Sequence, residues 1–69
     1  MRYLVVTENG YRIEFYGLQS HNLNTLNDIN LNFKGKMNLL AICKLLKTSF
    51  GDLQNVSIYI NGIFYKVRK

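Results

Sequence analysis

Apolar and polar side chains alternate along the first part of the chain, in two stretches that we expect to be strands, residues 2–8 and 11–18. Asn9-Gly10 separates them. Asn-Gly between two such stretches indicates a β-hairpin with a two-residue turn, because both residues tolerate positive φ. This turn directs one side of the hairpin into the core. The side chains predicted to face the core are Leu4, Val6, Ile13 and Phe15.

The C-terminal part of the chain has the same arrangement. Strands are expected over residues 55–60 and 63–68, on either side of Asn61-Gly62. A two-residue turn again determines which side chains lie opposite each other. The predicted cross-strand pairs are Ile60 with Ile63, Ile58 with Tyr65 and Tyr59 with Phe64.

The middle of the chain shows a different pattern. Residues 19–28 are polar and rich in Asn, which predicts a loop. Ile29, Leu31 and Phe33 then alternate with polar residues, and a period of two is typical of a half-buried strand. We therefore expect a third strand over residues 29–34.

Beyond Gly35 the spacing of apolar residues changes to three and four, which predicts an amphipathic helix over residues 38–50. Asn38 is a favourable capping residue for its start. Gly51 is placed to end the helix in the left-handed conformation. The apolar stripe of this helix consists of Leu39, Ile42, Cys43, Leu46 and Phe50.

These elements predict an α+β fold in a single domain, residues 1–69, with the chain order strand, strand, strand, helix, strand, strand. The expected architecture is a two-layer sandwich, in which an antiparallel or mixed sheet of four or five strands carries one amphipathic helix on one face. One helix covers one face only. The other face must therefore meet solvent, a partner or a second copy of the chain.

The sheet face away from the expected helix combines aromatic and basic side chains. Aromatic residues and Arg are enriched at the centres of protein interfaces. Aromatic rings with Lys and Arg also suit single-stranded nucleic acid, whose bases stack and whose phosphates attract cations. The same rings also stabilise exposed cross-strand pairs without any partner. The candidate binding residues on this face are Tyr3, Arg12, Tyr16, Lys34, Tyr59, Phe64, Lys66 and Arg68.

Charge and length narrow the choice of partner. Nine Lys and Arg against four Asp and Glu give a formal charge of +5 on 69 residues, which favours acidic partners. The basic residues are scattered, and no helix-turn-helix, zinc-finger spacing or RNA-recognition consensus is present, so a protein partner with an acidic surface is favoured over nucleic acid. A chain of this size buries only about 60% of its unfolded surface, so its core should be marginal.

Groups with catalytic or metal-binding chemistry are few and separated. His21 lies in the expected loop without a neighbouring carboxylate or thiol, and Cys43 lies on the apolar stripe of the expected helix, where a thiol usually fills space. The four carboxylates are scattered and do not match the spacing of a metal site. We therefore expect no enzyme activity, no catalytic residue, no metal and no cofactor.

The apolar runs fall far short of the roughly 20 residues needed to span a bilayer. A single cysteine cannot form an internal disulfide, and the N-terminus turns polar too early for an export signal. The sequence therefore predicts a cytoplasmic protein without a membrane partner.

The expected function is that of a small non-enzymatic binding protein that acts through protein–protein contact. Its small size and many Asn, Ile and Lys residues suit an origin in a bacteriophage or mobile element with an AT-rich genome. In that setting we expect an inhibitor or modulator of a host macromolecular machine, such as a nucleic-acid-guided defence complex, acting in the host cytoplasm. The alternative is a single-stranded nucleic-acid-binding module that uses the same face. A homodimer closed over this face is a third alternative.

Overall fold

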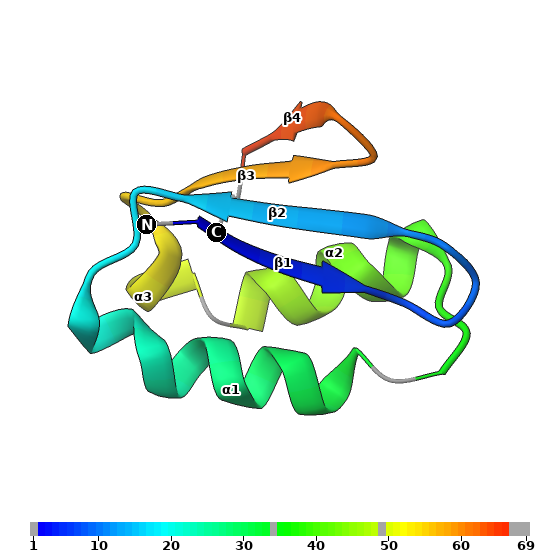
Figure 1. Ribbon diagram of the computed structural model, residues 1–69, viewed down its shortest axis with the longest axis horizontal. Coiled ribbons are helices and arrows are strands. Elements are labelled where there is room, and N and C mark those ends of the chain that lie inside the picture. The colour runs from blue at the N-terminus through cyan, green and yellow to red at the C-terminus, as the bar shows by residue number, and fades with distance from the viewer. Residues whose placement is uncertain (1, 34, 49, 67–69) are drawn as a thin grey trace.

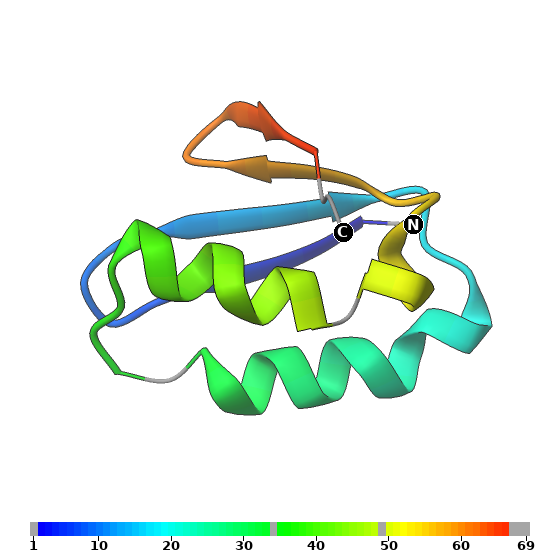
Figure 2. The same cartoon turned by 180° about the vertical axis from the view of Figure 1, so that it is seen from behind.

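The computed structural model describes residues 2–33, 35–48 and 50–66 of the chain. Its helices lie together on one side of an antiparallel sheet (Figures 1 and 2), which confirms the α+β class. The strands, in spatial order, are β1 (Arg2–Val6), β2 (Arg12–Tyr16), β3 (Ser57–Ile60) and β4 (Ile63–Tyr65). The helices are α1 (Leu23–Asn32), α2 (Leu39–Thr48) and the short α3 (Phe50–Leu53). The chain order is thus two strands, three helices and two strands, so the expected single helix is wrong.

The expected strand over residues 29–34 and the expected loop over residues 19–28 are both wrong, because this region forms α1. Leu26, Ile29 and Phe33 recur at helical spacing and are buried in the core. Leu31, which the alternating pattern placed on the same face as Ile29, is 60% exposed. Ile29 and Phe33 fit both periods, and the burial of Leu26 against the sheet favours the helix.

A short 3₁₀ turn, Ser20–Asn22, leads into α1. The backbone N–H of Gln19 donates to Oδ1 of the buried Asn22 at 2.9 Å, and the backbone N–H of Asn22 donates to the Gln19 carbonyl at 2.9 Å. These two bonds close the turn and satisfy the amide oxygen of a side chain that has left water. The Asn-rich stretch therefore starts a helix instead of forming an open loop.

The helix expected over residues 38–50 is present as α2, which ends at Thr48. Its predicted cap is confirmed, because the Ala41 N–H donates to Oδ1 of Asn38 at 2.8 Å. Ile42 and Leu46 face the core and are fully buried. Gly51 lies within α3 and is not among the glycines with positive φ, so its expected role as a left-handed terminator is wrong.

The first hairpin differs from the expected register by one residue, since Val5 pairs with Ile13 and Val6 pairs with Arg12. The Thr7 N–H donates to the Tyr11 carbonyl at 2.9 Å, so the turn contains residues 8–10 instead of residues 9–10. Gly10 adopts a φ of 93° at the end of this turn. A tight turn followed by a left-handed glycine is the usual geometry of a three-residue hairpin loop.

This shift reverses the direction of every side chain in β1, because side chains alternate between the two faces. Val5 and Thr7 are each 3% exposed, whereas Leu4 and Val6 are 39% and 52% exposed. The predicted core positions of Leu4 and Val6 are therefore wrong. Those of Ile13 and Phe15, which are fully buried, are confirmed.

Asn9 fastens this turn to the segment before α2. Its Nδ2 donates to the Met37 carbonyl at 2.7 Å, and its Oδ1 accepts the Met37 N–H at 3.0 Å. The same Oδ1 accepts the Thr7 hydroxyl at 2.8 Å, and that hydroxyl oxygen accepts the Tyr11 N–H at 3.0 Å. A further bond runs from the Glu8 N–H to the Gly35 carbonyl at 3.0 Å.

The second hairpin has the predicted register, with Ile60 opposite Ile63 and Tyr59 opposite Phe64. Asn61 and Gly62 have φ values of 51° and 80°, as a two-residue turn of this type requires. Its strands are shorter than expected, and residues 67–68 of the expected last strand lie outside the described residues.

We predict that Asn9→Ala lowers the free energy of unfolding by about 1–2 kcal/mol, because two hydrogen bonds to Met37 are lost at a partly solvated site. Urea denaturation measures this change. Asn27→Ala, on the exposed side of α1, is the matched control and should change stability by less than about 0.5 kcal/mol. Equal stability of Asn9→Ala and the wild type would contradict the anchoring role of Asn9.

Candidate functional site

The helices of the described residues all lie on one side of the sheet (Figure 1), and we refer to the opposite side as the outer sheet face. Strand pairing defines its members, because directly opposed residues share a face. They are Arg2, Leu4, Val6, Arg12, Glu14, Tyr16, Ser57, Tyr59 and Phe64.

The structure brings four of the predicted site residues together on the outer sheet face: Arg12, Tyr16, Tyr59 and Phe64. Lys66 is exposed directly after β4. Lys34 and Arg68 lie outside the described residues.

Tyr3 is the one predicted site residue that the structure places elsewhere. The register of β1 directs it towards the helices, where it is half-buried and packs on the core with its ring centroid 6.4 Å from that of Phe15. The prediction that Tyr3 belongs to the binding face is therefore wrong, for the same reason that Leu4 and Val6 were misplaced.

Leu4 and Val6 are the residues that sequence reasoning missed on this face. Residues 3–6 are apolar throughout, so hydrophobic alternation fits either register of β1 equally well. The only signal in the sequence was the turn, since Glu8-Asn9-Gly10 also fits a three-residue loop that ends in a glycine.

Three aromatic rings form a continuous stripe across β2, β3 and β4, which we refer to as the aromatic stripe. Tyr16 and Tyr59 lie 5.6 Å apart at 86°, and Tyr59 and Phe64 lie 5.5 Å apart at 66°. Both are edge-to-face contacts, which contribute about 0.5–1.5 kcal/mol each beyond burial of area. Tyr16 and Phe64 remain exposed, so the stripe is a preformed apolar surface.

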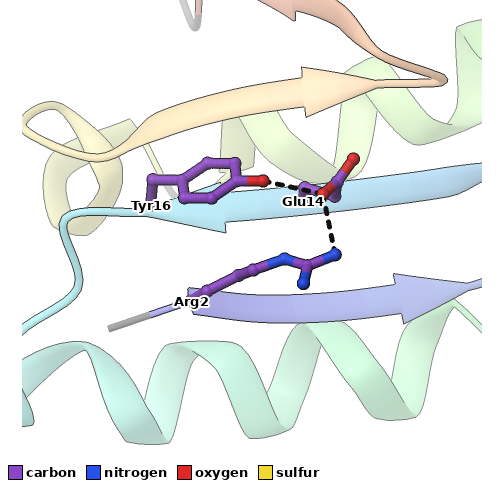
Figure 3. A network of polar contacts seen from close by, with 3 residues as sticks. All are labelled: Arg2, Glu14 and Tyr16. Carbon is purple, nitrogen blue, oxygen red and sulfur yellow. Dashed lines mark hydrogen bonds and ion pairs between the residues drawn. The ribbon is translucent and has the colours of Figure 1, made fainter.

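Glu14 lies beside the aromatic stripe and accepts two hydrogen bonds at one carboxylate oxygen, as Figure 3 shows. The Tyr16 hydroxyl donates to Oε2 at 2.8 Å, and Nη2 of Arg2 donates to the same oxygen at 3.0 Å in an ion pair. The Tyr16 hydrogen bond is the main cause that lowers the pKa of Glu14, and Arg2 adds to it while partial desolvation opposes both. The same bond raises the pKa of Tyr16.

This network leaves the outer sheet face positive. Arg2 balances the carboxylate of Glu14, whereas Arg12 and Lys66 form no ion pair with another described residue. A shallow hollow of about 430 Å³ lies beside the aromatic stripe, between Glu14, Tyr16, Ser57, Tyr59 and Gly62. The outer sheet face thus combines an aromatic centre, one carboxylate that is paired with an arginine, and two basic side chains, Arg12 and Lys66, at its margin.

The other candidate groups lie apart from this face. Within residues 2–33, 35–48 and 50–66, no three His, Cys, Asp or Glu side chains are grouped closely enough to hold a metal ion. His21 lines a small hollow of about 150 Å³ near Gly17 and Asn55.

No helix in the described part of the chain has the length and apolar character needed to cross a membrane.

Comparison of this chain with protein-family models, curated proteins and solved structures gives no match. Function is therefore argued from the chain's own residues.

We predict that Tyr16→Phe raises the pKa of Glu14 towards its ordinary value, because the ring is kept and only the donating hydroxyl is removed. Titration of the Glu14 carboxyl carbon by NMR measures the shift. Tyr59→Phe is the matched control and should leave Glu14 unchanged. An unshifted Glu14 in Tyr16→Phe would contradict the assigned hydrogen bond.

The same variant predicts a pH dependence of stability. The pKa of Glu14 is lower in the folded than in the unfolded protein, so the ionised carboxylate stabilises the folded state. This stabilisation is complete above the ordinary pKa of 4.5 and is lost as the pH falls through the pKa of Glu14 in the folded protein. The difference in unfolding free energy between the wild type and Tyr16→Phe should therefore be larger at pH 7 than at acidic pH. A difference that grows on acidification would have the wrong sign.

Proposed function

We propose that this chain is a small non-enzymatic binding protein that holds a protein partner with an acidic surface against its outer sheet face. The observation that carries the proposal is the aromatic stripe of Tyr16, Tyr59 and Phe64, which stands on a sheet face that the helices leave open. Rigid aromatic anchors on an open face are typical of the centres of protein interfaces.

The corrected register of β1 strengthens the apolar character of this surface. Leu4 lies opposite Glu14, which in turn lies opposite Tyr59, so an aliphatic side chain and the aromatic stripe flank the ion-paired carboxylate on the same face. Val6 extends the same face next to Arg12. Exposed apolar side chains gathered on one face and bordered by charged residues mark interaction sites on proteins.

Charge supports an acidic partner. The chain carries a formal charge of +5, and Arg12 and Lys66 border the aromatic stripe without an ion-pair partner among the described residues. Complementary charge at the margin of an interface speeds association and disfavours basic partners.

The finer role within this proposal is that of an inhibitor or modulator of a host macromolecular machine, such as a nucleic-acid-guided defence complex, encoded by a phage or mobile element. Its support is the small size, the Asn-, Ile- and Lys-rich composition and a binding face that spans one side of an 8.1 kDa chain. A protein of this kind acts by occupying a surface that its partner needs, which requires no catalytic group.

Single-stranded nucleic acid has less support as the partner. Base stacking needs open ring faces, whereas the rings of the aromatic stripe contact one another edge to face. Tyr3 also points to the other side of the sheet, so it cannot continue a run of stacked bases across the aromatic stripe. These features favour protein over nucleic acid.

We predict that Val6→Asp abolishes capture of the partner from a lysate of the native host, because it places a charge within the apolar part of the outer sheet face. Leu23→Asp is the matched control: it introduces the same charge at an exposed leucine of α1, where an acidic residue suits the helix start. Quantitative mass spectrometry of the captured proteins measures the difference. Equal recovery by both variants would remove the outer sheet face from the proposal.

The nucleic-acid alternative is tested with a fluorescent single-stranded oligonucleotide of mixed sequence. We expect no saturable change in anisotropy at low salt. Tight binding that falls steeply with ionic strength and is lost in Tyr59→Ala would contradict the proposal, because release of counterions from phosphates produces that salt dependence. Sedimentation of the isolated protein would show whether a second copy occupies the face instead.

A further inference from the structure

The helices cover the inner side of the sheet unevenly. Val5, Ile13, Ile60 and Ile63 form one cross-strand row on that side, one residue from each strand. Their exposed fractions are 3%, 0%, 6% and 73%. The helical layer thus closes over β1, β2 and β3 and stops before β4, which lies at the sheet edge far from α1 (Figures 1 and 2).

An apolar groove of about 440 Å³ occupies this uncovered region, between the inner side of β4 and α2. Its size lies within the range of roughly 300–1,000 Å³ found for ligand pockets. Its lining includes Leu39, Cys43, Ile60, Ile63, Phe64 and Tyr65. Tyr65 and Cys43 line it from opposite sides, and burial, with a smaller contribution from the neighbouring Cys43 thiol, raises the pKa of Tyr65.

The α2 side of the groove combines apolar and basic residues. Leu39 and Cys43 line the groove, and Lys47 follows them at the same spacing of four, which places it on the same side of the helix. No acidic residue is among the described residues that line the groove.

We propose that this groove binds an acidic amphipathic helix of a partner protein. Such a helix would pack beside α2 and beneath β4, continuing the helical layer over the strand that it leaves bare, since helices pack 8–10 Å apart and sheets bury an apolar face against them. Its apolar side would cover Ile63 and Leu39, and its acidic side would meet Lys47. The inference does not depend on the outer sheet face.

A second copy of this chain is a poorer occupant than an acidic helix. Each copy carries a formal charge of +5, so pairing two copies brings like charges together. An acidic helix instead gains from the same charges.

The test uses two fluorescein-labelled synthetic peptides of about 20 residues, long enough for measurable helicity. Both carry leucines at positions i, i+3, i+4 and i+7, and the polar side contains Glu and Gln in one peptide and Lys and Gln in the other. When the full chain is added, we expect a saturable rise in anisotropy for the acidic peptide and no such rise for the basic peptide. Binding should slow modification of Cys43, the single thiol of the chain, by a maleimide.

Matched variants locate the binding. Ile63→Asp should lower the affinity for the acidic peptide by more than about tenfold. Val6→Asp on the outer sheet face is the matched control and should leave this affinity unchanged, since both variants replace an exposed aliphatic residue of an edge strand. Lys47→Glu should lower the affinity for the acidic peptide and raise the affinity for the basic peptide. Circular dichroism confirms that each variant is folded.

Three results would overturn the inference: no binding of the acidic peptide, equal binding of both peptides, or equal binding by Ile63→Asp and the wild type. A dimer in sedimentation that Ile63→Asp converts to a monomer, without peptide binding, would assign the groove to a second copy. Failure of the outer-face proposal appears instead as partner capture that survives Val6→Asp.

Discussion

The amide of Asn9 holds the first turn against the backbone of Met37, and the orientation of β1 depends on this contact. The same amide oxygen binds the Thr7 hydroxyl, which in turn accepts the Tyr11 N–H, so the turn closes around residues 8–10. A turn of that length directs Val5 and Thr7 towards the helices and Leu4 and Val6 away from them. A contact between segments far apart in sequence thus stabilises the turn that decides which side chains of β1 face the helices.

The resulting outer sheet face differs in kind from the one that a two-residue turn would produce. It loses Tyr3 and gains Arg2, Leu4 and Val6, so aliphatic side chains join its aromatic and basic ones. Arg2 and Tyr16 donate hydrogen bonds to the carboxylate of Glu14, so this charge is ion-paired and held in place beside the aromatic stripe. A surface of this composition suits a protein partner better than the phosphates and bases of a nucleic acid.

The small size of the chain explains why it presents a second apolar surface as well. Its two long helices cover three strands and leave the inner side of β4 open, as the exposure of Ile63 beside the buried Ile60 shows. The outer sheet face and the groove meet at β4, where Phe64 belongs to both. A single edge strand therefore connects the two surfaces that we propose for binding.

The sequence by itself determined the elements whose signals are local. Asn38 marks the start of α2 through its own side chain, and Asn61-Gly62 determines the second hairpin through backbone conformation. Four residues of the outer sheet face follow from the second hairpin and from β2. Only the tertiary structure decided the remainder. Ile29 and Phe33 suit a helix and a strand equally, and residues 3–6 are apolar on both sides of a strand, so burial of Leu26 and the bond from Asn9 to Met37 select one arrangement. Local patterns cannot distinguish arrangements that bury equal apolar area, because the energy that separates them comes from partners distant along the chain.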